Sequence, residues 1–249
     1  DLLMVKALLP IDIANTQAAY YTVASTISKL PFYAVLAITS VLLPVISHWS
    51  HRERLDKVRF YIRETNRYTI MLIALPVVAV SATAKPLVEL LFKVTYAPAA
   101  IPLSILIFGI SFFALFSVLS SIVAGHGKPS VVAIVSFLAL VLDFGLNLVL
   151  IPTHGLVGAA FASTISMFFA LALLSAYVLF SFKALCSIKS FARILFAAAV
   201  TYVAALALPF TGYAILLTYI IVSLIYLIVL FLSRELEAKD FTLAREIIF

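Results

Sequence analysis

The chain has 249 residues, of which 65% are hydrophobic and only 11% charged, and its mean hydropathy is +1.20. Soluble domains are about 45–50% apolar and about 25% charged, so this chain has too few polar residues to cover a soluble fold. The net charge of +6 does not indicate a nucleic-acid partner, because the basic residues fall in short connections between apolar runs. The single cysteine, Cys186, excludes a disulfide within the chain. The composition therefore predicts a protein whose solvent is the lipid bilayer.

The chain starts with Asp1 rather than Met, and no charged segment precedes its first apolar stretch at 2–10. That stretch is too short to span a bilayer and does not have the organisation of a signal peptide. We expect it to be the end of a helix that begins outside the chain, so that an N-terminal portion of the protein is missing.

Seven further apolar runs are long enough to cross a hydrocarbon core, which takes about 20 helical residues. Helices are required because unpaired backbone groups cannot be left in lipid. The sequence therefore predicts an all-α, polytopic membrane protein. The runs lie near residues 17–46, 68–92, 99–124, 130–151, 155–181, 190–209 and 213–232.

The basic residues alternate between the two sides of these runs. Thirteen Lys and Arg residues fall in the connection 47–67, at Lys128, in 183–193 and after 232, whereas the alternate connections hold only Lys93. Cytoplasmic loops carry such an excess of basic residues. We therefore expect the connection 47–67 and the C-terminus to be cytoplasmic.

The connection 47–67 has a pattern of its own. Leu55, Val58 and Ile62 recur at helical spacing among charged residues. This pattern is typical of an amphipathic helix at the membrane interface, although a solvated charged loop fits the composition equally well.

Ionisable residues inside spans are costly and often mark function. Asp143 and Asn147 are four residues apart and share one face of a helix. A carboxylate beside an amide suits a sodium ion or a transferable proton, whereas the structural alternative is a hydrogen bond between helices. Lys6 and Lys29 would suit an anionic headgroup such as a pyrophosphate if they line a cavity, or they extend to the interface and anchor their helices.

The sequence shows no pattern that is typical of an enzyme. The sequence has no Gly-rich phosphate loop, no Cys/His cluster and no nucleophile paired with a base, and the non-cytoplasmic connections are too short for a catalytic domain. A polysaccharide polymerase or glycosyltransferase is therefore disfavoured. A scaffold without transport activity would leave the intramembrane charges unexplained.

Several segments, in order, resemble one family. AYYTVASTISKLP (19–31) with AITSVLLPVIS (37–47), PLVELLF (86–92) with Tyr96 and 99–100, and NLVLIP (147–152) with GLVGAAFAS (155–163) carry the resemblance. They are similar to the helix seven–eight, nine–ten and eleven–twelve regions of polysaccharide flippases. These flippases belong to the multidrug/oligosaccharidyl-lipid/polysaccharide exporter superfamily, and the resemblance covers about residues 1–165.

The resemblance implies a multidrug-exporter-like C-terminal lobe of about six helices plus an extra helical hairpin. Residues 1–182 would hold the end of helix seven and helices eight to twelve, and residues 183–249 would hold helices thirteen and fourteen with a cytoplasmic tail. The missing partner would be the N-terminal lobe of the same protein.

The implied function is translocation of polyprenyl-pyrophosphate-linked oligosaccharide across the cytoplasmic (inner) membrane by alternating access, as for O-antigen, capsule or exopolysaccharide. A multidrug and toxin extrusion antiporter is the nearest alternative, but Lys6 and Lys29 favour an anionic ligand. A lipid II flippase is a further alternative. Those proteins have an arginine where this chain has Thr26, although Lys29, one turn later, supplies a positive charge.

Lipid II flippases also resemble this chain in a sodium site, formed by an acid on helix seven, an Asn/Asp pair on helix eleven and a hydroxyl on helix twelve. Asp1, Asp143, Asn147 and either Ser163 or Thr164 would fill these roles, with the Asp and Asn in reversed order. Coupling to Na⁺ or H⁺ is therefore expected, with no other cofactor.

Overall fold

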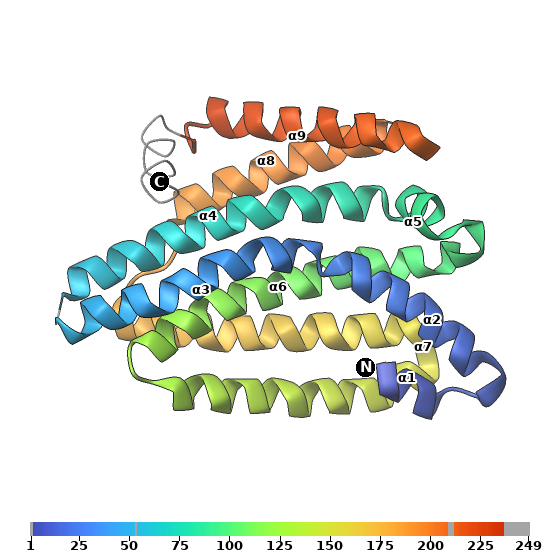
Figure 1. The fold of residues 1–249 in the computed structure, drawn as a ribbon, viewed down its shortest axis with the longest axis horizontal. Coiled ribbons are helices and arrows are strands. Elements are labelled where there is room, and N and C mark those ends of the chain that lie inside the picture. Colours follow the sequence, from blue (N-terminus) through green and yellow to red (C-terminus); the bar gives the residue numbers. More distant parts are fainter. Residues whose placement is uncertain (1, 53, 209–211, 237–249) are drawn as a thin grey trace.

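The computed structural model describes residues 2–52, 54–208 and 212–236, and all regular structure among them is helical (Figure 1). Six of the helices are long and apolar enough to cross a membrane, which confirms the predicted polytopic helical protein. The helices are α1 (Leu2–Leu8), α2 (Ile11–Ser28), α3 (Leu30–His51), α4 (Leu55–Ala82), α5 (Ala84–Phe92), α6 (Ala100–Gly125), α7 (Pro129–Phe182), α8 (Ile188–Ala207) and α9 (Ile215–Leu232), with short 3-10 helices η1 (Val94–Ala99) and η2 (Gly212–Ala214).

The longest helix, α7, is two spans joined by a reversal. Its 54 residues would extend about 80 Å at a rise of 1.5 Å per residue, far more than a bilayer core. At Gly155 the backbone adopts φ 57° and ψ −136°, a conformation that residues with a Cβ rarely reach. The chain turns back there, and the two halves of α7 run antiparallel (Figure 1). These halves match the predicted runs 130–151 and 155–181.

Two predicted spans are interrupted in the structure. The run 17–46 is divided between α2 and α3, with Lys29 between them. The junction of these two helices lies near the middle of the long axis of the molecule (Figure 1). Pro31 lies in the first turn of α3, where a proline is tolerated because its missing N–H is not needed. The run 68–92 is divided at Thr83, whose hydroxyl donates to the carbonyl of Ala79 at 2.6 Å.

The helix predicted within the connection 47–67 is present, but it is not a separate surface helix. Residues 55–67 are the first half of α4, and Val58 and Ile62 are fully buried in a core cluster formed with α3, α6 and α7. Most of the charged residues among them are exposed, on a helix that continues into the membrane, whereas Glu64 and Arg67 are partly buried.

The basic connections lie together at one end of the molecule. The α3–α4, α6–α7 and α7–α8 connections share this end, and the ends of α1, α5 and η1 lie at the other (Figure 1). Ser50 and His126 are hydrogen-bonded at 2.7 Å, and Arg59 donates to the Phe182 carbonyl at 2.8 Å. This arrangement agrees with the alternation of charge in the sequence, and the side of the bilayer that each end faces stays a prediction.

Helices α8 and α9 form a hairpin packed along α4 (Figure 1). Apolar contacts join Met71 and Ala79 of α4 to both helices of the hairpin. At the basic end, Arg67 donates to the Glu235 carboxylate at 2.8 Å, and Arg193 approaches the same carboxylate at 3.4 Å. Since only 2% of Glu235 is exposed, this ion-pair network fastens the end of the hairpin to α4.

The Gly158 position tests the reversal of α7. A Cβ at Gly158 would clash with the backbone oxygen of Leu150, so Gly158→Ala forces the two halves of α7 apart. We expect a loss of about 1–3 kcal/mol, the usual effect of overpacking. The measurement is thermal unfolding of the purified protein in detergent. Gly145→Ala is the matched control on the same helix, since nothing lies within 4 Å of its Cβ position. Equal melting temperatures for the two variants would contradict the close approach.

The Glu235 network is tested by Glu235→Gln, which removes the charge that Arg67 and Arg193 share. We expect the protein to lose about 1.5–3 kcal/mol of stability, as for hydrogen bonds to charged groups. Asp56→Asn is the control, because the Arg54–Asp56 pair is exposed and such pairs contribute little. Thermal unfolding in detergent measures both variants, and an equal effect would exclude a special role for the network.

Candidate functional site

A buried polar cluster lies between α2 and the two halves of α7. Its first part is the pair predicted from sequence: the side-chain amide of Asn147 donates to the backbone oxygen of Asp143 at 2.8 Å and to its carboxylate at 3.0 Å. Asn147 is fully buried, and Asp143 is partly buried. The amide therefore fixes one carboxylate oxygen of Asp143 on the face of α7 that packs inside the protein.

The second part of the cluster comes from beyond the reversal. Ser163 is buried, donates to the carbonyl of Ala159 at 3.0 Å and shares a 3.3 Å hydrogen bond with the hydroxyl of Tyr21. Tyr21, on α2, lies within electrostatic reach of Asp143. The turn at Gly155 thus brings Asp143 and Ser163 to one site, and α2 closes it.

The cluster contains oxygens that are suited to a small cation. The Oδ1 atom of Asp143 and the fully buried hydroxyl of Ser166 have no well-formed hydrogen bond within the described part of the chain, although Ser166 lies beside the Asp143 carboxylate. On α2, one turn before Tyr21, the side-chain carbonyl oxygen of Gln17 is also buried without a partner in the described part of the chain. Leaving polar atoms unpaired in an apolar interior is costly, and hard cations bind such oxygens.

A divalent metal fits this cluster poorly. Among the described residues, no group of three or more His, Cys, Asp or Glu side chains could hold a metal ion. Asp143 provides a single negative charge, and protein sites for Ca²⁺ or Mg²⁺ use several oxygen ligands, often with more than one carboxylate. A monovalent cation or a proton therefore matches the charge of the cluster better.

Ser163 and Thr164, the two alternative hydroxyl ligands predicted from the sequence, have different surroundings in the structure. Thr164 donates to the Ile105 carbonyl of α6 at 3.2 Å, and a Cβ at Gly109 would lie 2.7 Å from its hydroxyl. Thr164 therefore packs against α6, whereas Ser163 faces Tyr21. The other predicted member, Asp1, lies outside the described residues.

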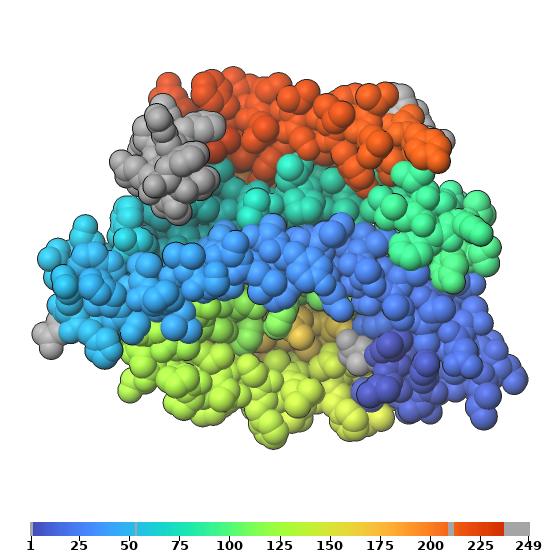
Figure 2. All heavy atoms as spheres, viewed as in Figure 1, coloured from blue at the N-terminus to red at the C-terminus, as the bar shows by residue number. Residues whose placement is uncertain are grey.

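Lys29 does not belong to this cluster and lies on an exposed face of α2. It is exposed at the α2–α3 junction, on a face of α2 that also exposes Thr22 and Thr26. These hydroxyls are hydrogen-bonded within their own helix, to the carbonyls of Ala18 and Thr22 at 2.8 Å each. Helices α2 and α3 run along the face turned to the viewer in Figure 2. An ammonium group midway along a membrane protein is costly against lipid, so this polar stripe fits a water-filled cavity.

Lys6 is exposed in the last turn of the short helix α1, on a different helix from the polar stripe. That Lys6 and Lys29 bind one headgroup stays a prediction.

Sequence reasoning missed Tyr21, Ser166 and Thr22. The spacing of Thr22, Thr26 and Lys29 by four and three residues was a detectable signal of one polar helix face. The contact between Tyr21 and Ser163 had no such signal, because these residues are 142 positions apart.

Comparison with known proteins identifies the family. A model of the family "Lipid II flippase MurJ" matches residues 3–244. The fold is similar to that of a lipid II flippase MurJ in its inward closed conformation, with a TM-score of 0.75 and 19% identity, over 88% of this chain and 48% of that one. An uncharacterized membrane protein, MJ1068 of Methanocaldococcus jannaschii, is 23% identical over 154 residues, which are 62% of this chain and 30% of that protein. The chain thus spans less than half the length of these relatives.

The family match confirms the predicted superfamily and corrects the branch, since the matching family is the lipid II flippases and not the polysaccharide flippases. Thr26 had counted against that branch, but Lys29 places a positive charge on the same exposed face. Flippases are transporters, so the prediction that the chain is not an enzyme also agrees with the match. The chain belongs to the lipid II flippase MurJ family.

Proposed function

We propose that the chain forms one lobe of a transporter that moves lipid II, or a closely related polyprenyl-pyrophosphate-linked sugar precursor, across the cytoplasmic membrane. The observation that carries this proposal is the family match over residues 3–244. The basic end of the lobe faces the cytoplasm, in keeping with the excess of Lys and Arg there. A second lobe completes the cavity, and the two lobes rock to give alternating access.

The polar stripe on α2 supports an anionic headgroup as the cargo. Lys29 supplies a positive charge beside Thr22 and Thr26, whose hydroxyls add polar contacts on the same face. An ammonium group binds phosphate oxygens as a strong point charge. The pyrophosphate of the cargo therefore binds at Lys29 as it crosses between the lobes.

An apolar groove supports a lipid-linked cargo. It has a volume of about 340 Å³ and lies between α3, α4 and α9, lined by residues such as Ile38, Leu72 and Leu227. A polyprenyl chain gains nothing from entering water, so its free energy is lowest when it stays in such a groove while the headgroup crosses.

The cluster at Asp143 is the proposed site of ion coupling. Tyr21 contacts Ser163 with one face of α2, and Lys29 lies on the exposed side of the same helix. Binding of Na⁺ or H⁺ at Asp143 therefore acts on the helix that carries the headgroup site. Coupling of this kind needs only two arrangements of α2 whose relative free energies the ion changes.

The substrate proposal is tested with Lys29→Ala in the full-length protein. Loss of a charge-assisted contact worth about 1.5–3 kcal/mol lowers transport roughly 10- to 100-fold. The measurement is flipping of fluorescent lipid II in reconstituted vesicles, with Lys29→Arg expected to retain most activity.

Lys85→Ala is the control, since Lys85 is also exposed but lies on α5, away from the stripe. Transport of a cationic dye, but of no polyprenyl-pyrophosphate-linked precursor, by the unaltered protein would contradict the proposed substrate class. Normal flipping by well-folded Lys29→Ala would contradict the role of Lys29.

The coupling proposal is tested with Asp143→Asn combined with Asn147→Ala. If Na⁺ binds the folded protein, it stabilises it by about 1.4 kcal/mol at ten times its Kd, and the double variant loses this increase in melting temperature. If H⁺ is the ion, the double variant instead loses the dependence of flipping on a pH gradient. Thr164→Val is the control, because Thr164 packs against α6. Flipping by the double variant that is unchanged across sodium and pH gradients would refute the ion site.

A further inference from the structure

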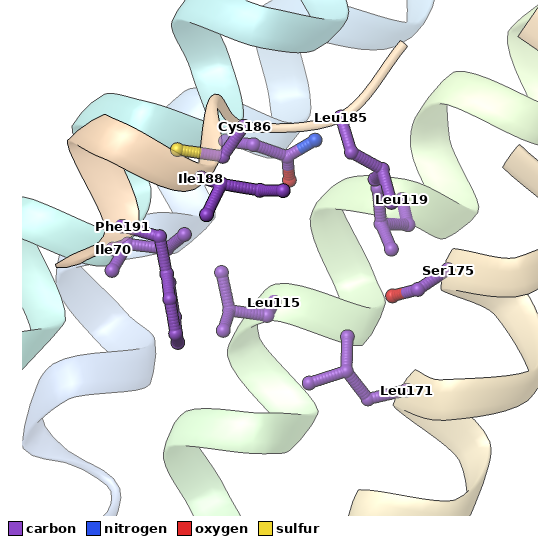
Figure 3. Close-up of a pocket in the computed structure, with 10 residues that line it drawn as sticks. Ile70, Leu115, Leu119, Leu171, Ser175, Leu185, Cys186, Ile188 and Phe191 are labelled. Atoms are coloured by element: carbon purple, nitrogen blue, oxygen red, sulfur yellow. The ribbon is translucent and has the colours of Figure 1, made fainter. Parts of the chain in front are cut away.

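A second cavity lies at the basic end of the lobe, away from the transport site. It has a volume of about 260 Å³ and is bounded by α4, α6, α7 and α8, with Cys186 of the α7–α8 connection at its edge (Figure 3). Its walls are mostly apolar and include Leu115, Leu171 and Phe191, which point into it from three different helices. None of its lining residues belongs to the Asp143 cluster or to the α2 stripe.

One polar group in this wall lacks a partner. Asn66 lines the cavity and is only 4% exposed, and its side-chain nitrogen has no hydrogen-bond partner in the described part of the chain. Buried polar groups are nearly always hydrogen-bonded, so an unpaired donor at a cavity needs explanation. Because the free group is an N–H donor, the missing partner brings an acceptor atom into a space whose other polar lining groups are the Ser175 hydroxyl and the Cys186 thiol.

Charged residues of both signs surround the cavity. The acidic Glu64 and Glu235 act on Cys186 at its edge but are ion-paired with Arg67, whereas the basic residues around the cavity are exposed. Lys189 follows the lining residue Ile188, Lys183 begins the connection that holds Cys186, and Arg63 lies one turn before Asn66; all three basic side chains are exposed. Phospholipid headgroups with a net negative charge are attracted to such basic clusters at the membrane surface.

The size of the cavity limits its occupant. Pockets for whole drug-sized ligands measure about 300–1,000 Å³, so this cavity is slightly smaller than that range. Part of one hydrocarbon chain fits the apolar walls, and an oxygen at the top of that chain satisfies Asn66.

We propose that this cavity binds an anionic glycerophospholipid of the surrounding leaflet. One acyl chain lies against Leu115, Leu171 and Phe191, and its ester carbonyl accepts a hydrogen bond from Asn66. The phosphate and the anionic headgroup lie near Lys183 and Lys189. The site is independent of the proposed transport activity, since it shares no residue with the transport site.

Cys186 is the reporter for the test, because it lines the cavity and is half-buried. The full-length protein is placed in nanodiscs of phosphatidylcholine alone or of phosphatidylcholine with phosphatidylglycerol. The rate of maleimide labelling is followed by mass spectrometry of the peptide that contains Cys186. All samples are kept at one pH, because burial raises the pKa of the Cys186 thiol and its reactivity depends on pH.

We expect phosphatidylglycerol to slow labelling severalfold in the unaltered protein. Asn66→Leu, which removes the donor, and Ser175→Phe, which fills the cavity, should each abolish this dependence on lipid. Ser181→Phe is the control for Ser175→Phe, since Ser181 is exposed on the same helix and outside the cavity. Asn66→Leu keeps the test decisive if Ser175→Phe does not fold.

Three outcomes would overturn the proposal. Equal labelling in both lipid mixtures would mean that the cavity holds water or a neutral lipid. Slowing that persists in both Asn66→Leu and Ser175→Phe would place the effect of phosphatidylglycerol at the surface. Slowing that is lost in Ser181→Phe as well would mean that the cavity is not its cause.

Discussion

A helix in hydrocarbon must satisfy its backbone groups internally, so a chain can reverse direction only where the backbone is shielded or reaches water. In this lobe the decisive reversal is at Gly155, whose φ of 57° no ordinary residue adopts easily. It turns α7 back on itself, and the absence of a side chain at Gly158 allows the second half to approach the backbone of Leu150. The polar cluster depends on this turn, because Asp143 precedes it and Ser163 follows it.

Because the second half of α7 packs against α2, the faces of α2 differ in their surroundings. One is closed against α7, where Tyr21 reaches Ser163, and the other carries Thr22, Thr26 and Lys29 to the exterior of the lobe. If an ion binds at the Asp143 cluster as proposed, it would alter the contacts of α2, and a movement of α2 would move Lys29. The proposed ion site and the proposed headgroup site are thus joined by one helix, α2.

The sequence was informative wherever one residue type had an unambiguous cost in lipid. Apolar runs and the one-sided distribution of Lys and Arg predicted the spans and their common basic end, and Asp143 with Asn147 was recognisable because polar residues are expensive there. Long-range contacts were not predictable, since nothing local indicates that Tyr21 faces Ser163. Nor was the choice between Ser163 and Thr164, because a step of one residue turns a helix by about 100°. The family branch was misjudged at Thr26 because a charge can move by one turn and remain on the same face, as Lys29 does.

Three polar contacts, at different positions along α4, bind the hairpin of α8 and α9 to this helix. Arg67 binds Glu235 at the basic end, Tyr226 donates to the Met71 carbonyl at 2.9 Å farther along, and Thr83 and Tyr219 are hydrogen-bonded at 2.9 Å at the other end. Apolar side chains of α4, α8 and α9 pack between these polar contacts. Polar bonds spread along the whole contact resist sliding as well as separation, because each has its own geometry. We therefore expect the hairpin to keep its position on α4, and the groove between α4 and α9 to keep its shape, during the proposed movement of the lobes. In the proposed transport cycle, a lipid chain in that groove would remain bound while its headgroup crosses the membrane.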